Sequence, residues 1–346
     1  MSEMRQTAKS SATDRPAPLV DAFARHITYL RLSVTDRCDL RCTYCMPEKM
    51  QFLPRNEVLT LDELHHLALG FIDRGIRRIR LTGGEPLVRR DMMDLVRALG
   101  RRLGEGLDEL TLTTNGTQLA EHASALADAG VERVNVSLDT IDPALFKRLT
   151  RRDRLEQVLA GIAAARAAGL KVKLNTVALK GLNEIELPDL IGWAHGEGHE
   201  ITLIEVMPLG EVDGDRMDHY LPLSAVRDRL EARWTLRSSS YRTGGPARYF
   251  DVEETGGRLG LITPLTQNFC EGCNRIRVTT TGQLYPCLGG GEQVDLRAAI
   301  RSADPEGALD DALDQAMRIK PARHAFRIDA HGQRPAQPRH MSMTGG

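Results

Sequence analysis

The sequence predicts an α/β protein whose core is a partial, TIM-like (β/α)6 barrel, followed by a smaller C-terminal region that caps the barrel. Two observations support this fold class. Strand-like and helix-like segments alternate over residues 26–207, and the alternation stops after residue 207. Strands that alternate with helices form a parallel sheet, and six such units are too few for the closed eight-unit barrel.

Each predicted strand is a short run of aliphatic and β-branched residues that ends in small or polar residues. The six runs are residues 29–35, 76–83, 109–116, 133–139, 171–177 and 200–207. Ligands of such sheets bind at the carboxyl ends of the strands. We therefore expect the polar residues that follow these strands to form one site.

Helical patterns lie between the strands, for example at 60–74 and 153–168. Thr60 is the predicted N-cap of the first, with Glu63 completing a capping box, and Gly169 ends the second. The region 208–346 begins with connections rich in Gly, Pro and Ser and then contains a second cysteine set. Its predicted helices are residues 294–302 and 305–319.

Charge and cysteine content exclude several protein classes. With 46 basic and 47 acidic residues the net charge is -1, so no overall field attracts nucleic acid or a membrane. The sequence contains no apolar run of about 18 residues. Residues 1–25 lack the apolar stretch of a signal peptide and are expected to form a disordered arm. Six cysteines in such a chain favour metal or redox chemistry in a reducing cytoplasm.

The first cysteine set, Cys38, Cys42 and Cys45, has the spacing C-x3-C-x2-C after the first predicted strand. Three thiolates can ligate three irons of a [4Fe-4S] cluster and leave the fourth iron open to a small molecule. A zinc site completed by a distant His or Asp is the alternative. Tyr44 precedes the last cysteine, where an aromatic ring can pack on an adenine, and the GGEP turn at 83–86 lets backbone groups approach a ligand.

The second set, Cys270, Cys273 and Cys287, again offers three thiolates, with the spacing C-x2-C-x13-C. On spacing alone, a zinc ribbon with an unspecified fourth ligand remains an alternative. A second cluster with an open iron would instead hold a substrate through nitrogen or oxygen.

Arg275 and Arg277 alternate along a predicted strand between these cysteines, so both side chains project from one face. The alternative is a solvated strand face. Beside a cluster, two guanidinium groups suit a phosphate. Arg31, Arg80 and Lys173 add positive charge at the same predicted end of the barrel, and together the five side chains fit a polyphosphate.

The C-x3-C-x2-C loop, the aromatic residue before its third cysteine and the GGEP turn resemble those of the radical S-adenosylmethionine (SAM) enzymes. The resemblance implies that the open iron chelates the amino and carboxylate groups of SAM. One electron then splits SAM into methionine and a 5′-deoxyadenosyl radical, which abstracts hydrogen from a substrate. Glu85 is expected to accept a hydrogen bond from the SAM amino group.

Across residues 26–346 the chain resembles more closely the molybdenum cofactor biosynthesis protein A family of GTP 3′,8-cyclases. The shared motifs are RLSVTDRC, CTYCMP, RLTGGEPLVRRD, LTTNG, VNVSLD, EVMPLG, NFCEGCNRIRVT and a terminal GG. The resemblance implies a lyase of molybdopterin biosynthesis that removes the ribose 3′ hydrogen of GTP and joins C3′ to C8, giving 3′,8-cyclo-7,8-dihydro-GTP. It also implies two [4Fe-4S] clusters, a homodimer, an external electron donor and cyclic pyranopterin monophosphate synthase as the next enzyme.

The resemblance assigns roles to individual residues. The cluster ligands are the six cysteines already named, three per cluster. The implied SAM contacts are Tyr44, Gly84, Ser137 and Met207. The implied GTP contacts are Arg31, Arg80, Thr113, Lys173, Arg275, Ile276 and Arg277. The implied catalytic residues are Arg275, Arg277, Gly345 and Gly346.

The two final glycines are expected to enter the active site and to pair their terminal carboxylate with an arginine. Thr344 stands where the family usually has an aliphatic residue. Two other classes stay open. An electron carrier would use four cysteines per cluster. A peptide-modifying radical SAM enzyme would carry more cysteines after residue 207 than the three found here.

Overall fold

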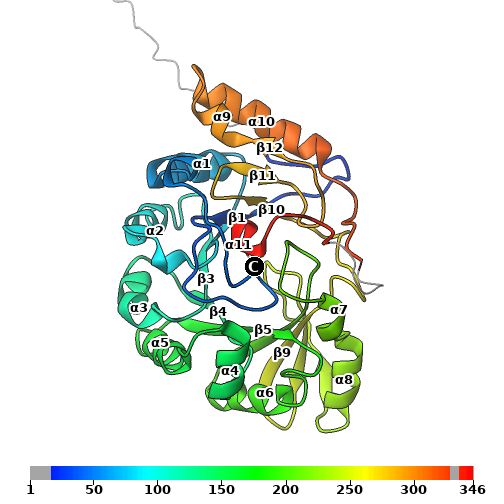
Figure 1. The fold of residues 1–346 in the computed structure, drawn as a ribbon. Helices are drawn as coiled ribbons and strands as arrows, with labels where there is room; N and C mark the ends of the chain where they lie inside the picture. Colours follow the sequence, from blue (N-terminus) through cyan, green and yellow to red (C-terminus); the bar gives the residue numbers. More distant parts are fainter. Residues whose placement is uncertain (1–16, 328–334, 346) are drawn as a thin grey trace, which may run out of the picture.

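One sheet organises the chain, and its centre is parallel (Figure 1). The computed structural model describes residues 17–327 and 335–345. The six predicted strands lie side by side in chain order, which confirms the partial barrel. They are β1 (Tyr29–Ser33), β2 (Arg78–Thr82), β3 (Glu109–Thr114), β4 (Arg133–Ser137), β5 (Lys171–Ala178) and β6 (Glu200–Glu205).

The region after residue 207 joins this sheet at both edges. The sequence analysis expected that region to cap the barrel, and the structure adds that six of its strands extend the barrel sheet. Next to β6 lie β9 (Gly257–Ile262), β8 (Arg248–Val252) and β7 (Leu236–Ser238). Next to β1 lie β10 (Arg275–Val278), β11 (Gln283–Tyr285) and β12 (Val294–Asp295). Since β1 and β6 would otherwise expose unpaired backbone groups, the added strands complete their hydrogen bonding.

Helices surround the outside of the barrel (Figure 1). The barrel helices are α1 (Leu61–Asp73), α2 (Met92–Gly100), α3 (Leu119–Asp128), α4 (Pro143–Thr150), α5 (Leu155–Ala167) and α6 (Leu187–Gly196), with 3-10 turns at Arg55–Glu57 and Pro86–Val88. The capping box of α1 is confirmed, because Thr60 Oγ1 accepts from Glu63 N at 3.1 Å and Glu63 Oε2 accepts from Thr60 N at 2.8 Å. The buried side chains Leu64, Leu67 and Phe71 give α1 one apolar face toward the sheet.

In the described part of the chain, the helices after the barrel are α7 (Arg216–His219), α8 (Leu223–Glu231), α9 (Leu296–Ile300), α10 (Pro305–Ile319) and α11 (Met341–Thr344). The predicted helix 305–319 is confirmed. The predicted helix 294–302 is partly wrong, because its first two residues pair with β11 as β12. Within residues 17–327 and 335–345, no helix has both the length and the apolar character needed to cross a membrane.

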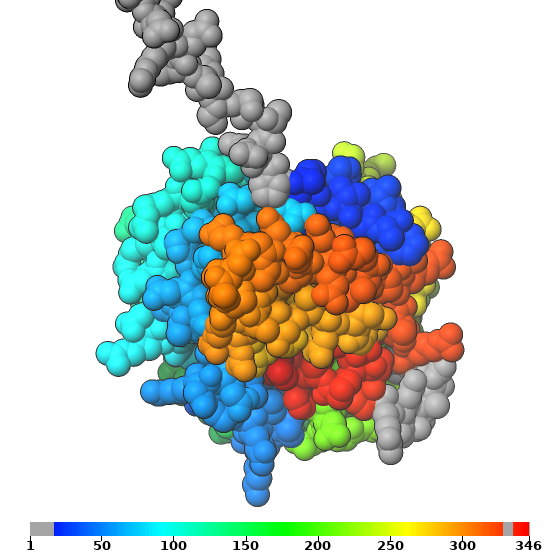
Figure 2. Space-filling model, turned by 90° about the horizontal axis from the view of Figure 1, so that it is seen from above, coloured from blue at the N-terminus to red at the C-terminus, as the bar shows by residue number. Residues whose placement is uncertain are grey.

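The segment before β1 packs against the body of the protein (Figure 2). Of the predicted arm, residues 1–16 lie outside the described part of the chain. Residues 17–25 are ordered, contrary to the prediction: Leu19 is buried, and Arg74 Nε donates to Ala17 O at 2.7 Å. Arg74 also pairs with Asp310 at 3.0 Å and with Asp314 on α10, so this segment, α1 and α10 form one unit.

Candidate active site

Two cavities adjoin in the barrel: the first lies at the carboxyl ends of the strands, and the second extends into the barrel interior, where Arg31, Arg80 and Lys173 lie within β1, β2 and β5. The first cavity is lined by Cys38, Cys42 and Cys45, and the second by Cys270, Cys273 and Cys287. Both cavities are lined by the same four residues, Asn175, Ile204, Met207 and Met341. The fold thus brings the two cysteine sets, far apart in sequence, to opposite ends of one chamber.

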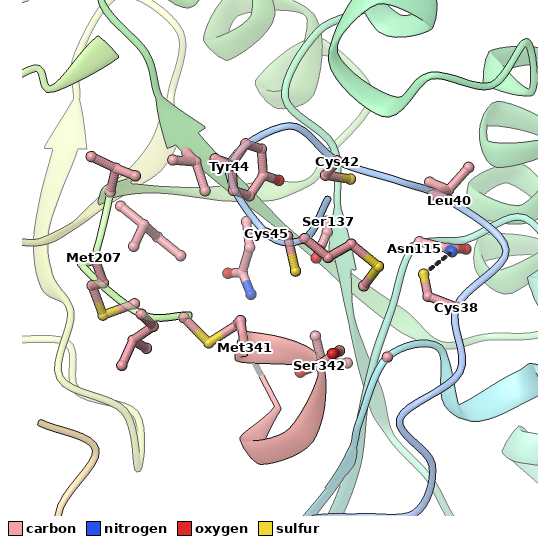
Figure 3. Close-up of a pocket in the computed structure, with 18 of the residues that line it drawn as sticks. Cys38, Leu40, Cys42, Tyr44, Cys45, Asn115, Ser137, Met207, Met341 and Ser342 are labelled. Carbon is pink, nitrogen blue, oxygen red and sulfur yellow. Dashed lines mark hydrogen bonds between the residues drawn. The ribbon is translucent and has the colours of Figure 1, made fainter. Parts of the chain in front are cut away.

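The loop that carries the first cysteine set is held by backbone contacts to α4. Arg41 N donates to Thr150 O and Thr43 N to Leu149 O, both at 2.9 Å. Asn115 Nδ2 lies 3.7 Å from Cys38 Sγ and is its hydrogen-bond donor (Figure 3). In the same view Met341 and Ser342 of α11 lie on the side of the cavity facing the thiols.

The three thiols of the first cavity are in surroundings that disfavour charge. Burial raises the pKa of Cys38 to about 12 and that of Cys45 to about 11. The pKa of Cys42 is raised well above its usual value by burial and by the other two thiols. Such thiols lose their protons when a metal takes the proton's place.

The glycine turn after β2 lies directly against the start of the cysteine loop. Gly84 N donates to Thr35 O at 2.8 Å, and a Cβ at Gly84 would lie 2.3 Å from Arg37 O. Gly83 has a φ of 140°. Only glycine allows so close an approach, and it leaves the backbone of Gly84 facing the first cavity.

Glu85 supports this turn and does not line the first cavity. Its fully buried carboxylate accepts from Leu87 N at 3.0 Å, Thr114 Oγ1 at 2.8 Å and Asn115 N at 2.5 Å. Burial raises its pKa to about 7. Three protein donors therefore occupy the oxygens that the sequence analysis expected to accept from SAM.

The four residues implied as SAM contacts, Tyr44, Gly84, Ser137 and Met207, all line the first cavity. Tyr44 OH donates to Asp139 Oδ2 at 2.6 Å, and Val177 N donates to Asp139 Oδ1 at 2.8 Å. Burial raises the pKa of Asp139 to about 6. The sequence analysis missed Asp139 as the group that orients Tyr44, although it is the last letter of the quoted VNVSLD motif.

A row of three arginines crosses the second cavity. Parallel register places Arg277 of β10 beside Arg31 of β1, and Arg31 beside Arg80 of β2. Neighbouring strands are about 4.8 Å apart, so three like charges lie close together in the barrel interior. Burial, followed by Arg80 and Arg277, holds the pKa of Arg31 well below its usual value, and burial with Arg275 lowers the pKa of Arg277 to about 10.

Lys173 and Arg275 complete the positive lining of the second cavity. Burial, followed by Arg133 and Arg80, lowers the pKa of Lys173 to about 7. Among the described residues that line this cavity there is no Asp or Glu. A polyanion would relieve the mutual repulsion of these groups.

Two implied GTP contacts lie elsewhere. Thr113 lines the first cavity and not the second, and its Oγ1 is buried without a hydrogen-bond partner. Ile276 is fully buried in the hydrophobic core, because it alternates with Arg275 and Arg277 along β10. Its side chain therefore packs away from the second cavity.

A hydrogen-bond chain links Lys173 to a loop at the second cavity. Lys173 Nζ donates to Tyr249 OH, which lies 3.1 Å from Thr243 Oγ1. Tyr249 is on β8 and is almost fully buried. The sequence analysis missed both residues, since no motif marked β8 or the loop before it as a neighbour of the barrel interior.

The second cysteine set lies among cations. Burial alone would raise the pKa of Cys273, but Lys320 and Arg275 outweigh it and lower that pKa to about 7. All six cysteines are free thiols. Within the described residues, no group of His, Cys, Asp and Glu side chains is placed to hold a single metal ion. Ligands of a cubane cluster need not converge on one atom, because each binds a different iron.

The C-terminal tail runs through the middle of the chamber. Met341 lines both cavities, Ser342 the first and Gly345 the second. Gly345 has a φ of 73°, and a Cβ there would lie 1.9 Å from Thr82 Oγ1. Thr344 is fully buried, and Gly346 lies outside the described residues.

Comparisons with known proteins agree with this arrangement. The family model of the radical SAM superfamily matches residues 32–194, and that of molybdenum cofactor synthesis C matches residues 199–326. A GTP 3′,8-cyclase of Erythrobacter litoralis (strain HTCC2594) is 73% identical over 328 residues, 95% of this chain and 98% of the relative. The GTP 3′,8-cyclase of Sinorhizobium medicae (strain WSM419) is 60% identical over 342 residues, 99% of this chain and 98% of the relative.

Solved structures resemble this one in fold. Streptococcus suis SuiB bound to S-adenosylmethionine has a TM-score of 0.60 and 17% identity, over 85% of this chain and 68% of that chain. Native anSMEcpe with bound AdoMet has a TM-score of 0.55 and 15% identity, over 82% of this chain and 83% of that chain. The sequence relatives decide the family: the chain belongs to the GTP 3′,8-cyclases of the radical SAM superfamily.

Proposed function

We propose that this chain converts GTP to 3′,8-cyclo-7,8-dihydro-GTP, the first step of molybdenum cofactor biosynthesis. The pair of adjoining cavities is the main support for this proposal. The first cavity has three thiols and the residues implied as SAM contacts, and the second has three thiols and five cationic side chains. Electron carriers need no such anion site. A peptide substrate would leave the row of arginines without a polyphosphate to bind.

The donor sets of both cavities fit [4Fe-4S] clusters with one open iron each. Each set offers three free thiols and no fourth cysteine, and each lines a cavity large enough to admit a ligand. We assign Cys38, Cys42 and Cys45 to the first cluster and Cys270, Cys273 and Cys287 to the second. When bound, the first cluster and SAM supply the hydrogen-abstracting radical, and the second cluster supplies an iron for the guanine base.

GTP would lie in the second cavity with its triphosphate on the cationic groups. Arg31, Arg80 and Arg277 form charge-assisted hydrogen bonds with phosphate oxygens, and Lys173 adds a fourth contact. The ribose then faces the residues common to both cavities, where Met207 and Met341 lie. Those side chains keep water from the carbon whose hydrogen is removed.

The tail is the remaining catalytic element of the proposal. Gly345 lines the second cavity with Arg275 and Arg277, and a carboxylate at the end of this tail would suit these guanidinium groups. The tail would orient the ribose 3′ position toward the first cavity. An external electron donor, a homodimer, a cytoplasmic location and delivery of the product to cyclic pyranopterin monophosphate synthase complete the proposal.

The decisive experiment is anaerobic incubation of the reconstituted protein with SAM, dithionite and GTP deuterated at the ribose 3′ carbon. We expect 5′-deoxyadenosine that has gained one deuterium and a cyclised nucleotide that has lost it. ATP, CTP and UTP serve as controls. Unlabelled 5′-deoxyadenosine, or equal product from all nucleotides, would contradict the proposed substrate position.

Iron content tests the two clusters separately. The anaerobic protein should hold about eight iron and eight sulfide per chain, and about four of each when either cysteine set is replaced by alanine. Elemental analysis for iron and zinc decides this. Zinc in the second set would remove the second cluster from the mechanism.

A further inference from the structure

A lysine that no motif singled out, Lys320, lies against the second cysteine set. It follows α10 directly and is 3% exposed. Its Nζ lies 3.7 Å from Cys273 Sγ and donates to Arg275 O at 3.0 Å and to Pro286 O at 2.6 Å. One buried ammonium group therefore connects Cys273, the strand with the active-site arginines and the residue before Cys287.

The backbone around Lys320 is anchored independently of its side chain. Arg25 Nη2 donates to Pro321 O at 2.7 Å, and its Nη1 donates to Ala322 O at 3.0 Å and to Cys270 O at 2.8 Å. Burying an ammonium group is costly unless it is well paired, and this one has two carbonyl acceptors and a sulfur. The position is thus built to hold a cation beside the thiol of Cys273.

The first cysteine set has a neutral donor in the corresponding role. Asn115 Nδ2 lies 3.7 Å from Cys38 Sγ, the same distance as Lys320 Nζ from Cys273 Sγ. Hydrogen bonds to ligand sulfurs and the charge near them set the reduction potential of an iron-sulfur cluster. A cation at this distance stabilises the more negative, reduced state more than an amide does.

We propose that Lys320 is a positioning residue that fixes the geometry of the second cysteine set and makes the cluster bound there easier to reduce by one electron than the same cluster without this cation. This inference rests on the second cluster of the proposed function. It gives Lys320 an effect on the reduction potential of this cluster in addition to the effects of the cysteines and arginines.

The test uses full-length protein in which Cys38, Cys42 and Cys45 are alanine, so that only the second cysteine set binds iron. Lys320→Gln keeps a hydrogen-bonding side chain and removes the charge, while Lys320→Arg keeps the charge. Arg323→Met is the matched control, because it removes a cation three residues away whose side chain is 66% exposed. Iron content, circular dichroism and a redox titration followed by electron paramagnetic resonance are measured for each.

At the potential where the cluster with Lys320 is half reduced, we expect the Lys320→Gln protein to show a tenfold lower ratio of reduced to oxidised cluster, equivalent to 59 mV. Lys320→Arg and Arg323→Met should stay within threefold of the parent. If Lys320→Gln is folded but loses iron, the positioning role is supported, and a Lys320→Arg variant that retains iron assigns it to the cation. A full cluster with an unchanged ratio in Lys320→Gln would overturn the proposal. Absence of iron from the parent protein itself would instead refute the second cluster.

Discussion

The two cysteine sets have the same number of thiols, but Cys38 of the first set and Cys273 of the second have opposite surroundings. At the first, burial and the carboxylate of Glu85 raise the pKa of Cys38 to about 12, and the side-chain donor to its sulfur is the neutral amide of Asn115. At the second, Lys320 and Arg275 lower the pKa of Cys273 to about 7 despite burial. Equal ligand counts therefore do not mean equal sites.

This difference agrees with the ligand that we propose for each cavity. The first cavity is lined mainly by apolar side chains and Tyr44, which suits an adenosyl group and a reactive radical. The second is lined by five cations, which suit a triphosphate. The charge that would bind substrate in the second cavity also acts on the thiols there. Experiments that separate the two cavities test this division.

The largest effect should come from removing one ligand of each cysteine set. Cys42→Ala should reduce 5′-deoxyadenosine formation to the level of a protein-free blank, because the proposal assigns SAM cleavage to the cluster held by Cys38, Cys42 and Cys45. Cys273→Ala should retain some uncoupled SAM cleavage but form no cyclised nucleotide. Chromatography of both products measures this. Equal loss of 5′-deoxyadenosine in both variants would mean that the second set serves folding or electron supply.

Deleting Gly345 and Gly346 should lower GTP cyclisation by on the order of a hundredfold, because a reacting group misplaced by about 1 Å costs that much. Iron content should stay at the full-length value, since the tail supplies no thiol. A synthetic peptide ending in MSMTGG, added to the truncated protein, should partly restore turnover. Full cyclisation by the truncated enzyme at saturating GTP and SAM would assign the tail no role in catalysis.

Arg80→Met should lower kcat/KM for GTP by about tenfold to a hundredfold, the size of one charge-assisted hydrogen bond to phosphate. Because Arg80 and Arg31 are adjacent cations in register, the same change should raise the unfolding temperature of the ligand-free protein. A lower unfolding temperature would argue that Arg80 stabilises the barrel.

The pKa of Lys173, lowered from 10.5 to about 7 by burial, Arg133 and Arg80, predicts two pH dependences. Between pH 7 and 10.5 the unfolded chain holds more protons at this residue than the folded one, so its contribution to unfolding free energy rises with pH. In the same range kcat/KM for GTP should fall as Lys173 loses its proton. Lys173→Arg should abolish this fall in kcat/KM. Urea unfolding and initial rates at several pH values measure both.

The smallest effect should come from Tyr249→Phe, which keeps the ring and removes the hydroxyl that accepts from Lys173. We expect a few-fold rise in KM for GTP and a shift of the kcat/KM break to lower pH, because the charged lysine loses an acceptor. Thr243→Val, which removes the next hydroxyl of the hydrogen-bond chain, is the control and should shift the break in the pH profile of kcat/KM less. An unchanged break in Tyr249→Phe would show that the hydroxyl has no part in setting the pKa of Lys173.

Local sequence patterns were enough to predict the barrel strands, the start of α1 and the glycine turn. Strand and helix alternation identified all six barrel strands, and Thr60 and Glu63 identified the start of α1, because periodicity and capping depend on residues a few positions apart. The spacing of the cysteines predicted two sets of three thiols for the same reason. The GGEP turn could be predicted from the sequence, because only glycine tolerates the close backbone approach found at Gly84.

Pairings between distant segments could be decided only by the tertiary structure. Nothing local indicates that β9 and β10 extend the barrel, that Tyr249 reaches Lys173, or that Lys320 lies 3.7 Å from Cys273. The three donors to Glu85 likewise come together only through the fold, since they lie in its own turn, on β3 and in the residue after β3. Sequence records which groups are present, but the charge and hydrogen bonding around each group depend on which segments the fold brings into contact.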